Sequence, residues 1–395
     1  RGQGSPLDLT SVLINEGTPE VCGGDGTFFV PVEIDGNVVY YRDADTSTEP
    51  STKPVDAAVI DLERQDWDDM YGPVYTSVDR TASDCSGYYE FLSIPPILTY
   101  RVTPSKATDF EGAVDPYDAA LNAQHVVGLI SLTANQSLAA DVTGNGTLSS
   151  YDSAHIAQFS VATITEFPVA TVNGSDWTFV PAPQVEPNQT VINPYPPARQ
   201  QGRIEYSPII EPAENQDFHA ILYGDVSGNW VGTCGVMSAL SEASDGSTAG
   251  ISAAGDRTPG KKAKDAGLIS LPTVHAAPGE EIIVPIQVSG AAEAISFLLS
   301  LRYDPAVLEL LGAEVGDGAA RFHLEANTGE AGRARLALFS ANPLGGDGEI
   351  LNVRFRVVGS PRSRSPLTLS TSRVNEGGVP VTVREGKVIV LPRPS

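Results

Sequence analysis

Basic residues are scarce in this chain of 395 residues, where 25 Lys and Arg stand against 49 Asp and Glu. The formal net charge is −24 and the sequence pI is near 4.4. A surface this acidic repels phosphate backbones, so we expect no nucleic-acid partner. Long hydrophobic runs are missing too, and no apolar stretch approaches the length that crosses a bilayer. We therefore expect no membrane span, and an acidic surface suited to binding divalent cations.

Residue patterns typical of enzymes are also missing. None of the histidines belongs to a metal-binding pair or to a Ser/His/Asp pattern. No glycine-rich phosphate loop follows a predicted strand. Acidic residues are so abundant that a pair of carboxylates at glycosidase spacing is a poor signal. The sequence thus predicts no enzyme. The histidines are His125, His155, His219, His275 and His323.

Cysteine is scarce, with three residues in the chain. Cys22 and Cys85 both lie in the N-terminal region, and a disulfide between them fits an exported protein. Cys234 is then left free or paired between chains. The chain begins at Arg1 with neither a methionine nor a signal peptide. We read this as a mature secreted product, extracellular or at the cell surface, although a trimmed chain would look the same.

Glycine and proline are abundant, with 38 and 30 residues, and 41% of the chain is hydrophobic. This composition favours strands and turns over long helices, so we expect a mainly β chain of two to four domains. Four segments are expected: a β-sandwich spacer over 1–106, calcium-binding repeats with a β extension packed back on them over 107–236, a flexible linker over 237–267, and a second β-sandwich over 268–395.

Residues 141–152 have the spacing of a twelve-residue calcium loop. Calcium prefers six to eight oxygen ligands, and this spacing wraps oxygens around one point, with Gly146 where the loop must turn. A polar turn before a helix, with a serine as N-cap, is the other interpretation. The positions that would hold the ion are Asp141, Thr143, Asn145, Thr147 through its backbone carbonyl, Ser149 and Asp152.

Part of this pattern recurs 34 residues upstream, where 117–124 repeats the Tyr, Asp, Ala and Gln of 151–158 in register. Counting back gives a loop with Gly112 at the turn but Ala107 at the first position, so one carboxylate is missing. A helical-hairpin solenoid would need three or more copies. The expected ligands of this first site are Asp109, Glu111, Ala113 through its carbonyl, Asp115 and Asp118.

A third fragment follows at 224–230, where Asp225, Ser227 and Asn229 match loop positions 1, 3 and 5. The rest of a loop is absent. This fragment either completes the defective first site from a distance or is a simple polar turn.

Two stretches of the first half resemble known families. The calcium loop closed by Asp rather than Glu, followed by one amphipathic helix and present twice, resembles a dockerin, with Ala107 as a departure. The stretches 87–91 and 100–103 resemble the closing hairpin of prealbumin-like or collagen-adhesin B-type domains, which supply stalks and spacers in surface proteins.

The last segment resembles a cohesin domain over nearly its whole length, 268–392. The turn 278–281, the alternating run 295–303 followed by Asp304 and Pro305, and the run 346–355 stand in the order found in cohesins. The resemblance implies a jelly-roll sandwich that binds dockerins on one sheet face.

A chain with a dockerin-like and a cohesin-like module can bind another copy of itself. We expect a secreted, calcium-binding structural protein that assembles head to tail into an extracellular filament, because a heterologous contact closes into a ring or propagates. The alternative is a cellulosome-type adaptor scaffold whose cohesin captures dockerin-bearing enzymes. A third reading is a calcium-stiffened stalk, with the repeats bound by the N-terminal spacer and the cohesin free.

Overall fold

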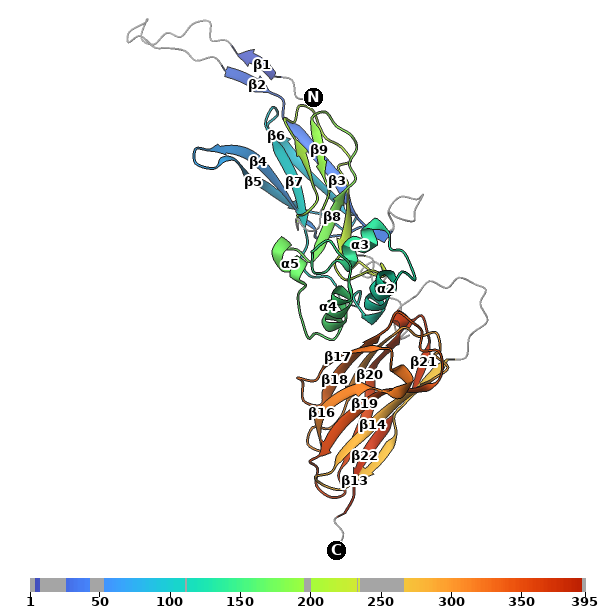
Figure 1. Cartoon of the computed structure of the whole chain (residues 1–395). Helices are drawn as coiled ribbons and strands as arrows, with labels where there is room; N and C mark the ends of the chain where they lie inside the picture. The colour runs from blue at the N-terminus through green and yellow to red at the C-terminus, as the bar shows by residue number, and fades with distance from the viewer. Residues whose placement is uncertain are drawn as a thin grey trace, which may run out of the picture. The chain divides into compact units, whose positions relative to one another are not determined.

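The computed structural model describes residues 4–7, 26–42, 53–110, 112–194, 200–232, 234 and 266–392. The chain is mainly β, as expected, and divides into two compact units (Figure 1). The first unit combines 1–108, 172–222 and 231–242, and the second combines 109–171, 223–230 and 243–395. No helix among the described residues is long and apolar enough to cross a membrane.

The first unit is built on two sheets, and β3 in one sheet and β7 in the other alternate buried and more exposed side chains, as strands facing a core do. The strand orders are β5-β4-β7-β10-β9 and β6-β3-β11-β8, and β1 pairs with β2 separately. The strands are β1 (Gly4–Leu7), β2 (Gly26–Phe29), β3 (Val32–Tyr40), β4 (Val59–Asp68), β5 (Gly72–Ala82), β6 (Tyr88–Ile94), β7 (Tyr100–Ser105), β8 (Trp177–Pro181), β9 (Gln189–Ile192), β10 (Arg203–Tyr206) and β11 (Phe218–Leu222).

The strands of the β extension belong to this sandwich and do not pack on the calcium repeats as expected, whereas its segment 223–230 lies with the repeats. Strand β10 pairs antiparallel with β7, and β11 pairs parallel with β3. Without them β3 and β7 would each present an unpaired edge, and one sheet would have only two strands. The helical repeats are therefore inserted between β7 and β8 in the sequence of the sandwich.

The disulfide also differs from the expected pairing. Cys85 is bonded to Cys234, with the two Cα atoms 5.6 Å apart, so it does not pair with Cys22, which lies outside the described residues. The bonded residues are 149 positions apart and meet because the chain returns to the first unit after 223–230. Nearness in sequence did not predict the disulfide partner, since the inserted helical repeats separate segments of the same sandwich in the sequence.

The second unit contains the helical module, which we define as residues 109–171 and 223–230. Its helices are α2 (Pro116–Val126), α3 (Ala134–Ala140) and α4 (Ser150–Ser160), and α5 (Pro168–Asn173) begins in it. The segment 223–230 joins the repeats through Gly224 N–H, which donates to the Ala139 carbonyl at 2.8 Å. Gly224 has φ +89°, and a Cβ there would lie 2.8 Å from the Phe167 ring, so only glycine fits this return.

The rest of the second unit is a sandwich of two sheets (Figure 1, orange to red). The strand orders are β16-β19-β14-β12-β21 and β13-β22-β20-β15-β18-β17, and we call the second the docking sheet because α2 and α4 lie against it. The elements are β12 (Gly267–Ser270), β13 (Thr273–Ala276), β14 (Glu281–Ser289), β15 (Ser296–Arg302), β16 (Leu308–Val315), η2 (Asp317–Ala319), β17 (His323–Asn327), β18 (Arg333–Phe339), β19 (Gly348–Val357), β20 (Arg364–Val374), η3 (Asn375–Gly377), β21 (Val381–Arg384) and β22 (Gly386–Val390).

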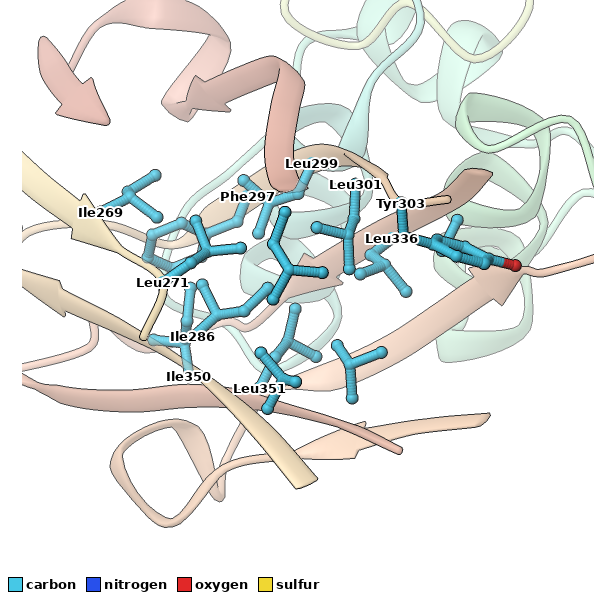
Figure 2. Close-up of a cluster of buried hydrophobic side chains, with 14 of the residues drawn as sticks. Ile269, Leu271, Ile286, Phe297, Leu299, Leu301, Tyr303, Leu336, Ile350 and Leu351 are labelled. Atoms are coloured by element: carbon cyan, nitrogen blue, oxygen red, sulfur yellow. The ribbon is translucent and has the colours of Figure 1, made fainter. Parts of the chain in front are cut away.

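Inward side chains of the two sheets form one core between them. Figure 2 shows Phe297, Leu299 and Leu301 of β15 together with Ile286 of β14 and Leu351 of β19. Each of these five is fully buried. Burial of this much aliphatic and aromatic area is the main stabilising contribution to such a sandwich. The linker expected over 237–267 lies outside the described residues except for Ala266 and Gly267, and Gly267 begins β12.

Candidate calcium sites and docking face

The continuous loop, residues 141–152, has the local geometry of an ion-binding turn. The Asp141 carboxylate accepts the N–H groups of Asn145 at 3.1 Å and Gly146 at 2.8 Å. Gly144 and Gly146 have φ +67° and +81°, the left-handed region that glycine adopts without strain. The loop therefore wraps around its own first carboxylate.

The last residue of the loop faces the first. Asp152 lies in the first turn of α4, and its Oδ1 accepts the Thr143 N–H at 3.2 Å and hydroxyl at 2.9 Å. Its Oδ2 accepts the Ser149 N–H at 3.0 Å. The Thr143 hydroxyl also lies 3.3 Å from Asp141 Oδ1. Positions 1, 3 and 12 are thus brought together.

The donor set of the continuous loop fits a hard cation. Asp141, Thr143 and Asp152 are all buried and offer only oxygen atoms. Burial raises the pKa of Asp141, and the nearby Asp152 carboxylate adds to that rise. Calcium would be held by these groups and by Asn145, Ser149 and the Thr147 carbonyl. A bound cation would offset the cost of burying two carboxylates side by side.

A second site of the same design is split between two segments. The Ser227 N–H donates to Asp118 Oδ1 at 2.8 Å, as the Thr143 N–H donates to Asp152. The Asp225 carboxylate accepts the N–H groups of Asn229 and Trp230, both at 3.1 Å. These are the bonds that Asp141 makes with the residues four and five positions on.

We define the split site as Asp115, Asp118, Asp225, Ser227 and Asn229, which hold loop positions 9, 12, 1, 3 and 5. Asp115 caps α2 as Ser149 caps α4, each in a capping box with the aspartate three residues later. The Asn229 side-chain oxygen Oδ1 is buried without a hydrogen-bond partner. The third fragment therefore lies where it would complete the defective first loop.

Two other expected ligands of the first loop make backbone hydrogen bonds, through groups that are not the expected ligand atoms. The Asp109 carbonyl accepts the indole N–H of Trp230 at 2.9 Å, and the Ala113 N–H donates to the Phe110 carbonyl at 3.1 Å. Glu111 lies outside the described residues. Of the contiguous set, the structure brings Asp115 and Asp118 to the site.

An acidic residue that sequence reasoning missed joins the split site. One carboxylate oxygen from each of Asp115, Asp118 and Glu376 lies within 4.8 Å of the others. Burial raises the pKa of Asp115 to about 6 and that of Glu376 to about 8. Burial, followed by the charges of Glu376 and Asp225, holds the pKa of Asp118 well above its ordinary value. Glu376 follows β20, and nothing in its sequence neighbourhood signals a ligand.

Helices α2 and α4 lie against β15, β17 and β18 of the docking sheet. Gln124 Nε2 donates to the Ala341 carbonyl at 3.2 Å, and Gln158 Nε2 donates to Glu325 Oε1 at 3.3 Å. Asn327 Nδ2 donates in return to the carbonyls of Val161 and Ala162, at 3.0 and 2.9 Å. The two glutamines hold the same position in the two repeats, so both repeats present equivalent faces to the sheet.

Comparison with known proteins places the sandwich of the second unit in a family. The family model described as a cohesin domain matches residues 268–388. A search of the curated proteins found no match.

Several solved cohesins are similar to this part of the chain. A non-cellulosomal cohesin from Archaeoglobus fulgidus is 24% identical, with a TM-score of 0.30 over 32% of this chain and 93% of that one. A type I cohesin–dockerin complex from Clostridium thermocellum, Coh-OlpC–Doc435, is 22% identical, with a TM-score of 0.29 over 34% of this chain and 99% of that one. The cohesin CaCohA2 from Clostridium acetobutylicum is 18% identical, with a TM-score of 0.29 over 33% of this chain and 94% of that one. The family match and the two-sheet sandwich together identify residues 268–388 as a cohesin domain, a protein-interaction module.

Proposed function

We propose that this protein is a secreted, calcium-binding structural protein that assembles head to tail into an extracellular filament. The dockerin-like helical module of one copy binds the cohesin domain of the next. Calcium holds the continuous loop and the split site in their folded form, since metal binding to a loop that is unformed without it contributes folding free energy.

The observation that carries the proposal is the fit of helices α2 and α4 to the docking sheet within one chain. Donors and acceptors are matched in both directions, from Gln124 and Gln158 to the sheet and from Asn327 back to the module. A surface that fits its own cohesin domain also fits the identical domain of another copy. That contact uses different surfaces on its two sides, so it is heterologous and propagates unless it closes.

Isosteric variants of the full chain test this proposal. In the helix variant, Gln124→Glu with Gln158→Glu, one carboxylate faces the Ala341 carbonyl and the other faces Glu325. In the sheet variant, Asn327→Asp, an acceptor replaces the donor between two carbonyls. Each change places two hydrogen-bond acceptors against each other. The binding free energy between module and cohesin domain should fall by about 2 kcal/mol or more, which lowers their affinity roughly thirtyfold.

Light scattering in calcium separates the outcomes. At protein concentrations above the effective concentration of the contact within one chain, wild type forms large particles, whereas each variant alone stays small. A mixture of the two variants stops at a dimer, because one copy offers only its cohesin domain and the other only its module. Gln287→Glu, at an exposed position of β14 in the other sheet, is the matched control and assembles like wild type. A wild type that is monomeric with calcium and with EDTA would instead favour the adaptor, whose cohesin captures a dockerin-bearing enzyme.

A further inference from the structure

Glu376 of the cohesin domain is held in place by its own domain. It lies in η3, directly after β20, and both Asn375 and Glu376 have positive φ, 47° and 56°. Asn375 fixes this turn, because its Oδ1 accepts the N–H groups of Ile295 at 2.9 Å and Ser296 at 3.1 Å. The turn is thus anchored to β15, the strand against which α2 lies.

The Glu376 side chain reaches the split site of the helical module. Its Oε1 accepts the Ser227 hydroxyl at 2.7 Å, and Ser227 holds position 3 of that site. The Glu376 carboxylate also lies within 4.8 Å of Asp115 and Asp118, and the latter is fully buried. Three carboxylates from two domains therefore converge on one point.

A second observation points to an ion at this place. The Asn229 oxygen Oδ1 is buried with no hydrogen-bond partner, at the position where a calcium loop supplies its third side-chain ligand. In the continuous loop the equivalent oxygen, Asn145 Oδ1, accepts the Thr147 N–H at 2.8 Å. A cation at the split site would satisfy an acceptor that the chain itself leaves unpaired.

We propose that one calcium ion at the split site is held by both domains, with Glu376 as the ligand that the cohesin domain supplies. Together with Asp115, Asp118, Asp225, Ser227 and Asn229, it gives six oxygen-bearing side chains, the lower limit for calcium. None is histidine or cysteine, so the set is selective for a hard cation over zinc. This inference deepens the proposed function, on which it rests for the identity of the ion.

Charge at the site supports a divalent cation. Four of the six side chains are carboxylates, and the arginine that an ion pair connects to them is Arg373, whose Nη2 lies 3.7 Å from Asp115 Oδ2. One positive charge leaves the cluster strongly acidic. A pocket of about 500 Å³ lies beside Glu376 and gives an ion a path to it; its lining residues are Tyr117, Glu293, Asn375, Glu376, Gly378 and Val379.

The shared ion makes calcium part of the contact as well as of the module's fold. A contact that supplies a ligand raises the affinity for the ion, and the ion raises the strength of the contact by the same factor. The helical module of a copy with no cohesin partner would bind one calcium tightly, at the continuous loop, and a second more weakly, at the split site.

Calorimetric titration of calcium into the metal-stripped full chain tests the proposal. Wild type binds two ions. Glu376→Gln keeps the shape and the acceptor for Ser227 but removes the charge, so one of the two sites weakens at least about tenfold and the other is unchanged. Glu314→Gln is the matched control, since Glu314 is an exposed residue of β16 in the other sheet of the cohesin domain. Both of its sites should keep wild-type affinity.

Terbium luminescence identifies the affected site. The three tryptophans are Trp67, Trp177 and Trp230, and the backbone N–H of Trp230 donates to Asp225 of the split site. Tryptophan-sensitised terbium emission should therefore fall in Glu376→Gln and in the sheet variant Asn327→Asp, which weakens the contact without touching a ligand. Unchanged calcium affinity and terbium emission in Glu376→Gln would overturn the shared site.

The two proposals fail in different ways. If Glu376→Gln binds both ions as tightly as wild type and wild type still assembles with calcium, Glu376 is not a ligand. The proposal of head-to-tail assembly is then unaffected. If wild type stays monomeric but Glu376→Gln still weakens one calcium site, the shared ion is supported within single molecules. The filament proposal is then overturned.

Discussion

The Ser227 N–H donates to Asp118 Oδ1 at 2.8 Å across 109 positions of sequence. The same bond in the continuous loop, from Thr143 to Asp152, spans nine. The same hydrogen-bonded geometry, in which we propose that calcium binds, is therefore built once from a continuous segment and once from two segments that the fold brings together. The split version depends on the return of 223–230 to the helices, so its geometry is a property of the whole module.

Removal of calcium should unfold the helical module before the cohesin domain. The module holds buried carboxylates in pairs and has few large apolar side chains between α2 and α4, so the ion contributes much of its stability. The cohesin core is aliphatic and aromatic and contains no candidate loop. In EDTA, helical circular dichroism should be lost at lower temperature while the strand signal persists. One cooperative transition, unmoved by EDTA, would contradict this.

The carboxylate at position 1 of the split site should contribute as much to calcium binding and to stability as the equivalent carboxylate of the continuous loop. Asp225 is fully buried and accepts the N–H groups of Gly228, Asn229 and Trp230. In Asp225→Asn an amide donor would face backbone donors, which should cost about 2 to 3 kcal/mol in urea unfolding with calcium present. Calcium stoichiometry should fall from two to one.

Two further substitutions serve as a comparison and a control for Asp225→Asn. Asp141→Asn makes the same change in the continuous loop and should also remove one ion, with a comparable loss of stability. Asp317→Asn, on an exposed residue of η2, makes the same chemical change away from both sites and should alter neither quantity. If Asp225→Asn binds two ions, the fragment at 224–230 is a polar turn and the split site is wrong.

Local patterns predicted the parts of the fold that are local. The alternating run predicted over 295–303 corresponds to β15, because alternation has a period of two in any sheet. The continuous loop could be identified as a candidate because all six of the residues predicted to hold its ion lie within twelve positions. Glu376, Asn327 and the Cys85–Cys234 bond were not, since each depends on segments that meet only after folding.

The disulfide should stabilise the first unit and leave the second unchanged. It joins Cys85, in the turn before β6, to Cys234, which follows the inserted module. Cys234→Ser should lower the free energy of unfolding of the first unit by about 2 to 4 kcal/mol, because the bond restricts the unfolded chain. Calcium stoichiometry should not change.

Peptide mapping without reduction checks the pairing itself. Digestion should yield one linked pair that contains Cys85 and Cys234, with Cys22 recovered as a free thiol or joined to another chain. A linked peptide of Cys22 with Cys85 would contradict the bond and restore the pairing first expected from the sequence.

Assembly should depend on protein concentration in a particular way. One docking sheet accepts one pair of helices, so contact within a chain and contact between chains exclude each other. Module and cohesin domain belong to one chain, so the internal contact has an effective concentration that a second copy must exceed, of the order of millimolar for linked modules. Closed monomers should therefore dominate dilute solutions in calcium, and the mean mass should rise with protein concentration. Sedimentation velocity over a dilution series checks this. A mass that stays at one chain over the whole series would mean that the module serves its own cohesin domain, and a large mass that persists on dilution would mean that the internal contact does not compete with the one between copies.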